Sequence, residues 1–322
     1  MTARENYLTA ARGGKPERVP VFPGDCNVFM PDFWMERDPE TGTDFCNIKW
    51  VRNDVGEMPM PGWRAMEELS QWRETVKFPD PDALDWEGMA GRFQRESDPD
   101  KVNIAMLNTT GVFLIPVNML GWEDALCAVC EEPEEMEAFV SAIADFLVKI
   151  AGKIGEFIHP DIMFTGDDFA AAGGPFLAKD VFRRIYKPHL KRINDAIHAA
   201  GALAEFHCCG NCQYLIREFI DCGADICQLP EPNEQLLADK RELGNRLVIT
   251  GGWDRHGPGC APFASEEAVR ESVRTAIQTY GKDGALIFWD GGICGTSEDS
   301  QNKIRWVCDE AEKYGSSFYK KG

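Results

Sequence analysis

Residues 202–229, ALAEFHCCGNCQYLIREFIDCGADICQL, predict a strand, a polar turn, a helix and a second strand in sequence order. Short apolar runs at residues 202–206 and 225–229 have the length and composition of buried strands. Between them, residues 213–222 place apolar side chains at helical spacing. Two strands joined by a helix lie parallel in one sheet. This stretch therefore predicts one βαβ unit.

The same alternation of strands and helices extends over the chain from residue 101 onward. At least six βα units fit, and an earlier strand near residues 19–22 fits the start. We therefore expect an α/β fold, a closed (β/α)8 TIM barrel rather than an open doubly wound sheet. No G-x-G-x-x-G motif follows a strand, which further disfavours a dinucleotide-binding fold. The other expected strands are 102–113 (running into a loop), 161–164, 247–250 and 285–289, and the other expected helices are 133–157, 179–200, 233–243, 265–280 and 298–314.

The first hundred residues are less regular. Pro, Trp and Met interrupt the periodicity every few residues, as in MPMPGW at 58–63, which indicates loops and short helices. We expect one TIM-barrel domain over residues 1–322, with an irregular N-terminal extension at 1–100 and regular βα units at 101–322.

Charge and cysteine content restrict the partners and the compartment. The 322 residues include 34 Lys and Arg against 53 Asp and Glu, a formal net charge of −19. Nucleic acids and anionic membranes require a basic face, so we exclude both as main partners. No apolar signal core and no run of about 18 apolar residues is present. We expect a cytoplasmic protein whose 12 cysteines are free or bind metal, and the sequence leaves a homodimer open.

Polar, glycine or metal-capable residues follow five consecutive predicted strands. In a TIM barrel this is the end at which the βα loops form the active site. A barrel built only for stability does not need such residues there, so we expect an active site at this rim. The segments are TGDD at 165–168, HCCGNC at 207–212, PEPN at 230–233, GGWD at 251–254 and DGGIC at 290–294.

His207 and Cys209 form the sharpest local signal for chemistry. Residues two apart in an extended segment point the same way, so the imidazole and the thiolate can take two corners of a zinc tetrahedron. Cys294, after the last strand, would supply a third ligand, and Glu231 is a candidate for a fourth. Three protein ligands with one open position are typical of catalytic zinc. The alternative is a buried free cysteine beside a hydrogen-bonded histidine.

Other residues are candidates for catalysis or substrate binding. We expect Asp167 or Asp168 to act as a general base or a substrate ligand, the alternative being a loop or helix cap. The remaining candidates are Trp253, Asp254 and Asp290 for catalysis or substrate binding, and Phe29, Trp34 and His256 for a substrate pocket.

Two C-x-x-C pairs leave a redox role open. Cys209 and Cys212 follow a strand and precede a helix, which is the setting of a thioredoxin-like motif. Cys127 and Cys130 lie in a helical region, where we expect them only to pack. A redox protein would titrate as a dithiol without metal.

Several of these motifs together resemble the uroporphyrinogen decarboxylase superfamily. They are FTGDD at 164–168, Pro188 in the next helix, HCCG at 207–210 and GGWD at 251–254. The resemblance covers about residues 100–322, and the first hundred residues match only loosely. True decarboxylases of this superfamily bind their polycarboxylate substrate through an Arg-rich N-terminal motif. VPVFPGD at 19–25 is acidic and apolar instead, which disfavours that reaction.

The zinc-dependent branch of the superfamily fits better. His207, Cys209, Gly210 and Cys294 are similar to the H-x-C-G motif and late cysteine of methylcobamide:coenzyme M methyltransferases. Methyltransferases of aryl-ether O-demethylase systems belong to the same branch. The resemblance implies a zinc ion and a small corrinoid protein that carries a cobalamin-type cofactor.

The choice of methyl donor depends on the surroundings of the rim. A coenzyme M site must hold a sulfonate, and Arg255 is the one cation on the rim, whereas the N-terminal loops are rich in aromatic residues. We therefore expect an O-demethylating component that moves a methyl group from an aryl methyl ether to Co(I) of the corrinoid protein. A coenzyme M-type thiol methyltransferase is the alternative, and a decarboxylase-like enzyme is the further alternative.

Overall fold

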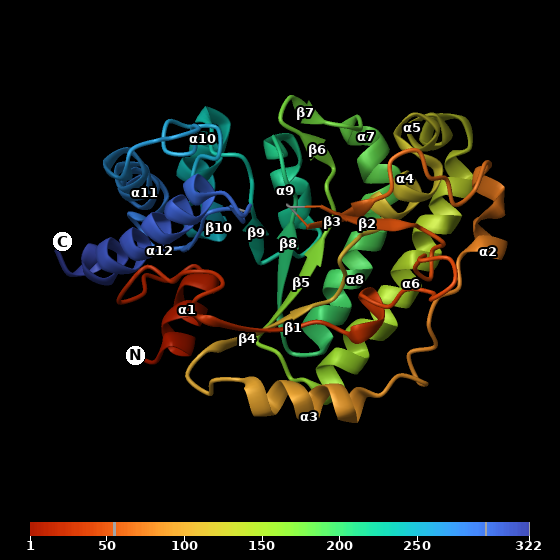
Figure 1. Cartoon of the computed structure of the whole chain (residues 1–322), viewed down its shortest axis with the longest axis horizontal. Coiled ribbons are helices and arrows are strands. Elements are labelled where there is room, and N and C mark those ends of the chain that lie inside the picture. The colour runs from red at the N-terminus through yellow and green to blue at the C-terminus, as the bar shows by residue number, and fades with distance from the viewer. Residues whose placement is uncertain (54–55, 294, 322) are drawn as a thin grey trace.

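A curled parallel sheet forms the centre of the computed structural model, which describes residues 1–53, 56–293 and 295–321 (Figure 1). Within these residues the sheet has seven strands in the order β1-β4-β5-β8-β9-β10-β11, all paired in parallel. This is an α/β fold consistent with a TIM-like barrel. The strands are β1 (Cys26–Phe29), β4 (Val102–Met106), β5 (Ile162–Gly166), β8 (Leu203–His207), β9 (Ile226–Gln228), β10 (Val248–Gly252) and β11 (Leu286–Trp289).

Helices connect the strands and surround the sheet (Figure 1). The long helix α6 buries Met136, Phe139 and Val140 at spacings of three and four, as an amphipathic helix must, and packs against α8. No helix of the described residues is both long and apolar enough to span a membrane. The helices are α1 (Ala3–Ala11), α2 (Trp72–Thr75), α3 (Trp86–Glu96), α4 (Leu114–Leu120), α5 (Trp122–Glu131), α6 (Pro133–Phe157), α7 (Lys179–Val181), α8 (Lys187–Ala199), α9 (Gln213–Asp221), α10 (Glu234–Leu243), α11 (Glu266–Gly281) and α12 (Glu298–Phe318).

The expected helix at 133–157 is confirmed with the same bounds, and the one at 179–200 is divided. A π-helical turn, Phe182–Tyr186, separates α7 from α8. Pro188 lies in the first turn of α8 and has no N–H to donate to the preceding turn. The regular hydrogen-bond ladder therefore restarts at this point.

The start of the sheet also differs from the expectation. The expected strand at residues 19–22 is not found. The first strand, β1, begins four residues after this segment and pairs with β4. The earlier segment bonds to β11 at the other edge of the sheet. The Phe288 N–H donates to the Pro20 carbonyl at 2.8 Å, and the Phe22 N–H donates to the Phe288 carbonyl at 2.9 Å. Pro20 and Pro23 have no N–H, so a longer ladder cannot form.

An aromatic cluster attaches the irregular N-terminal part to α6. Phe33, Trp34, Phe45 and Phe78 each pack against Phe146, with ring centroids 4.9 to 6.5 Å apart. Two antiparallel hairpins lie outside the main sheet: β2 (Trp50–Asn53) with β3 (Gly56–Pro59), and β6 (Ala170–Ala171) with β7 (Gly174–Pro175).

Glu218 on α9 is a buried carboxylate that forms ion pairs with basic side chains of α7, the π-helical turn and α8. Its Oε1 accepts from Arg183 Nη2 at 2.6 Å, its Oε2 accepts from Lys187 Nζ at 2.7 Å, and Lys179 lies 3.5 Å away. The hydrogen bond from Arg183, followed by the hydrogen bond and the charge of Lys187, lowers the pKa of Glu218 to about 2. Since the pKa falls on folding, the ionised carboxylate stabilises the fold at neutral pH, and this contribution is lost as the pH falls toward 2.

Glu218→Gln is expected to lower the free energy of unfolding at pH 7 by about 1–2 kcal/mol, a figure reduced for solvent screening of its exposed partners. Urea unfolding at pH 7 and pH 3 measures the difference, which is expected to shrink at the lower pH. Glu267→Gln is the matched control, because its side chain is 79% exposed in its ion pair with Arg274. An equal cost in both variants would contradict the prediction.

Candidate metal centre

Strand β8 turns Glu205 and His207 toward the interior of the curled sheet. Phe206, between them, packs against Phe219 of α9 with ring centroids 4.5 Å apart, so it faces the helices. Successive side chains of a strand alternate between its two faces. Glu205 and His207 therefore share the opposite face, and His207 is the last residue of β8.

Three different donor atoms converge just beyond this strand end. His207 Nε2 lies 3.3 Å from Cys209 Sγ and 3.7 Å from Asp168 Oδ1. Asp168 Oδ1 also accepts the backbone N–H of Cys209 at 2.7 Å, which holds the turn after β8 against the end of β5. One ligand atom from each of the three residues lies within 4.8 Å of the other two, and all three side chains are half-buried. This arrangement brings together nitrogen, sulfur and oxygen donors for one cation.

Gly210 shapes the turn that carries Cys209. Its φ is +80°, and a Cβ added there would lie 2.8 Å from backbone atoms of Ala170 and Ala171. The Asn211 N–H donates to the Ala171 carbonyl at 2.9 Å. The β6–β7 hairpin therefore lies directly against this turn, and the close approach requires glycine.

Burial sets the protonation of the candidate ligands. Burial, followed by the nearby Asp168 carboxylate, raises the pKa of Cys209 to about 11, while Arg255 opposes the shift. Burial also lowers the pKa of His207, although Asp168 and Gln228 act in the other direction. Without a cation the site thus holds a neutral thiol and a neutral imidazole at pH 7. Binding of a metal to the thiolate would release a proton.

Glu231 does not belong to the group of three converging donors. Its Oε1 is 3.3 Å from His256 Nε2, and its Oε2 is 4.0 Å from Arg255 Nη2. Arg255 in turn packs on the β11 loop, where a Cβ at Gly291 would lie 2.6 Å from its Cδ. Cys294, the third ligand expected from the sequence, lies outside the described residues.

The other carboxylates expected in the site, Asp167, Asp254 and Asp290, accept hydrogen bonds from backbone N–H groups. Asp167 is buried and accepts the N–H groups of Phe113 at 2.7 Å and Leu114 at 2.9 Å, at the start of α4. Burial raises the pKa of Asp167 to about 8. Asp254 accepts the His256 N–H, and Asp290 accepts the Gly292 N–H. Burial raises the pKa of Asp290.

The aromatic residues nearest the donors differ from those expected. Trp253 is buried and donates its indole N–H to Ser272 on α11, and Trp34 donates to the Leu107 carbonyl. Phe29 is also buried and packs on Phe93 of α3. The rings beside His207 are Phe164 of β5 and Trp289 of β11, with centroids 5.6 and 6.2 Å away. The position of Trp289 at a strand end was the available sequence signal.

The cysteines of the two C-x-x-C pairs differ in exposure. Cys212 is buried and its Sγ lies 3.7 Å from the Cys208 carbonyl, and both Cys209 and Cys212 are free thiols. Cys127 and Cys130 are exposed on α5, so the expectation that they pack was wrong. Helix α5 has its apolar face on Ala125, Ala128 and Val129, which leaves both cysteines on the outer side.

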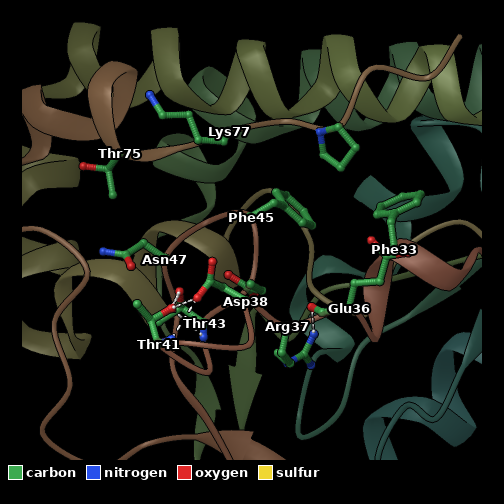
Figure 2. A pocket seen from close by; sticks show the side chains of 12 residues that line it. Phe33, Glu36, Arg37, Asp38, Thr41, Thr43, Phe45, Asn47, Thr75 and Lys77 are labelled. Atoms are coloured by element: carbon green, nitrogen blue, oxygen red, sulfur yellow. Dashed lines mark hydrogen bonds between the residues drawn. The ribbon is translucent and has the colours of Figure 1, made fainter. Parts of the chain in front are cut away.

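A cavity of about 590 Å³ is lined by residues of the N-terminal part (Figure 2). Phe33 and Phe45 form its apolar wall, and Thr41, Thr43 and Lys77 contribute polar groups. None of the three converging donors lines it. Its largest rings already pack on α6, so the cavity is a depression beside the aromatic cluster.

Comparisons with known proteins bear on both the fold and the family. No curated protein matches the sequence. Among solved structures, a methyltransferase from Methanosarcina mazei has a similar fold, with a TM-score of 0.63 and 12% sequence identity over 98% of this chain and 99% of the other. The family model for uroporphyrinogen decarboxylase (URO-D) matches residues 74–312. The chain therefore belongs to the uroporphyrinogen decarboxylase (URO-D) family.

Proposed function

We propose that this protein is a zinc-dependent methyltransferase that moves a methyl group from a methoxylated aromatic to Co(I) of a small corrinoid protein. The observation that carries the proposal is the convergence of His207 Nε2, Cys209 Sγ and an Asp168 oxygen at the end of β8. The likeness in fold to a methyltransferase supports the same reaction class.

The donor set fits zinc. Imidazole nitrogen and thiolate sulfur are the ligands that zinc most often takes in proteins, and carboxylate oxygen is also accepted. His207, Cys209 and Asp168 would hold the ion, and Cys294 and Glu231 remain proposed as further ligands. When bound, zinc would act as a Lewis acid on the ether oxygen and make the phenolate a better leaving group.

The surrounding residues would bind and orient the donor. Phe164 and Trp289 flank His207 and offer ring faces to an aromatic substrate. Arg255 lies beside Glu231 at the rim, where its charge would compensate an anionic product. In the proposed reaction the methyl C–O bond would break with its electron pair left on the phenolate oxygen, and Co(I) of the corrinoid protein would receive the methyl group. Trp253, Asp254 and Asp290 belong to loops that we propose border the substrate.

The proposal includes a closed (β/α)8 barrel over residues 1–322 whose rim receives the corrinoid protein. It is supported by the backbone bonds that Pro20 and Phe22 make to Phe288 at the far edge of the sheet. In TIM barrels the loops after the strands form one face. The free thiols fit a reducing, cytoplasmic setting.

A thiol methyltransferase of the coenzyme M type is the second candidate, and Arg255 favours it. The guanidinium lies 4.0 Å from Glu231 and beside the Cys209 thiol, so it would place a cation next to the candidate metal centre, where a sulfonate would bind. The two candidates differ in the direction of methyl transfer and in the acceptor.

The test is a methyl-transfer assay with zinc-loaded protein, a reduced corrinoid protein and a panel of donors. Methoxybenzoates, methanol, methylamines and methyl thioethers are compared by chromatography of the demethylated products. We expect phenol formation from the methoxybenzoates only. Methylation of coenzyme M from methylcobamide, without demethylation of aromatics, would support the second candidate. Metal-independent turnover of a porphyrinogen would identify a decarboxylase and overturn both.

A further inference from the structure

A chain of polar side chains runs from His207 into the buried interior of the sheet. His207 pairs in register with Gln228 of β9, and Gln228 pairs with Thr250 of β10. Glu205 lies two residues before His207 on the same face of β8. Glu205, Gln228 and Thr250 are 0%, 3% and 0% exposed. An apolar interior would be the default at these positions, so the polar row requires a reason.

Donors and acceptors can be assigned for two of the contacts along this row. His207 Nδ1 lies 2.7 Å from Gln228 Oε1, and Thr250 donates its hydroxyl to Glu205 Oε1 at 2.5 Å. The Gln228 side chain lies close enough to Glu205 to lower the pKa of this carboxyl group, against the larger effect of burial, which raises it. Within the described residues, Gln228 Nε2 and Glu205 Oε2 are both buried, and neither makes a hydrogen bond. A buried donor and a buried acceptor on the same face thus both lack a partner, and pairing them would satisfy both.

The orientation of the Gln228 amide decides which nitrogen of His207 is free. An amide oxygen only accepts, so Oε1 toward the ring requires the proton on Nδ1 and leaves a lone pair on Nε2. The reversed amide would donate to Nδ1, and the proton would then sit on Nε2. Nε2 is the atom that faces Cys209 and Asp168. Only the first orientation leaves His207 able to bind a metal there.

We propose that Glu205 and Gln228 are positioning residues that fix the Nδ1–H tautomer of His207 and aim its Nε2 lone pair at the candidate metal centre. Glu205 holds the amide group of Gln228, because a carboxyl oxygen accepts from the NH2 end and repels the oxygen end. Thr250 occupies the other oxygen of Glu205 and keeps the carboxyl group in place. The metal-binding consequence rests on the proposed function, whereas the tautomer does not.

The first readout is the tautomer of His207 in the metal-free protein, measured by nitrogen-15 NMR of the imidazole rings. The His207 signals are assigned by their loss in His207→Ala. We expect Nδ1–H in the native protein and a shift toward Nε2–H in Gln228→Met and Glu205→Met. Glu205→Gln is expected to keep the native tautomer, because its own amide oxygen can accept from Gln228 while its NH2 group faces the Thr250 hydroxyl. Gln278→Met, on the exposed face of α11, is the matched control.

The second readout is zinc affinity by competition with a chelator. Gln228→Met and Glu205→Met are expected to lose about 10–100-fold, the usual effect of removing a hydrogen-bond partner of a metal ligand. Gln278→Met is expected to lose nothing. If the native protein binds no zinc but the His207 tautomer shifts in Gln228→Met and Glu205→Met, the proposed function fails and the positioning role stands. If the native protein binds zinc and both variants keep tautomer and affinity, the positioning role is overturned.

A folding control distinguishes a changed tautomer or zinc affinity from a loss of the fold caused by the substitution. Thermal unfolding of each metal-free variant identifies any that lose the fold. Gln228→Glu then replaces such a variant, because its carboxylate still accepts from Nδ1–H and is expected to retain the native tautomer. An Nε2–H ring in a folded Gln228→Glu protein would also overturn the proposal.

Discussion

His207→Ala is expected to reduce zinc affinity by more than about 100-fold and to bring methyl transfer to background, since losing a direct ligand exceeds the effect of losing a partner of that ligand. The reason is the small size of the donor set. Only three donors, Asp168, His207 and Cys209, cluster among the described residues. Cys209→Ala is expected to have the same effect, as is Cys294→Ala if that residue is the further ligand.

Metal analysis after chelator competition, together with the donor assay, measures both losses. His198→Ala is the matched control, because this histidine of α8 is partly exposed and pairs with Asp225, just before β9. It is expected to keep full zinc content and activity. Retained methyl transfer in His207→Ala after the zinc has been lost would rule out the proposed mechanism.

Gly210→Ala is expected to displace the turn that carries Cys209 and so to weaken both folding and metal binding. The new Cβ would lie 2.8 Å from backbone atoms of Ala170 and Ala171, which cannot rotate away as a flexible side chain would. The positive φ adds strain of about 1–2 kcal/mol for a residue with a Cβ. We expect a total loss of about 2–4 kcal/mol in unfolding free energy and a clear loss of zinc affinity.

Gly201→Ala separates the two contributions. Gly201 has a φ of +85°, close to that of Gly210, but an added Cβ would meet no atom within 4 Å. Its cost is therefore the backbone strain alone, and its zinc affinity is expected to be unchanged. Urea unfolding and chelator competition on both variants give the comparison. Equal losses in the two variants would mean that contact with the β6–β7 hairpin does not matter.

The regular half of the fold could be predicted because its signals are local. Apolar spacing of three and four marks α6, and short apolar runs ending in polar residues mark β8 and β9. The N-terminal part could not be predicted in the same way. Its order depends on rings such as Phe33 and Phe45 packing on Phe146, about a hundred positions away, and on backbone bonds from Pro20 to Phe288. No local pattern carries such pairings.

The residues of the candidate site also differ in whether local sequence or strand pairing brings them together. His207 and Cys209 were predicted because they lie two apart at a strand end, and the structure brings their donor atoms together. Asp168 was expected as a base or substrate ligand, and its closeness to both became visible only with the pairing of β5 and β8. Gln228 was missed because only the register between β8 and β9 puts it opposite His207.

The bonds between the Pro20–Phe22 segment and Phe288 have a consequence for how the chain is made. Ribosomes add about 5–20 residues per second, so about 13–54 seconds separate the synthesis of Pro20 from that of Phe288. Strand β1 can pair with β4 early, but the segment just before it makes its bonds to β11 only after that strand has left the ribosome. We therefore expect the bonds between residues 20–22 and Phe288 to form only after almost the whole protein has been translated.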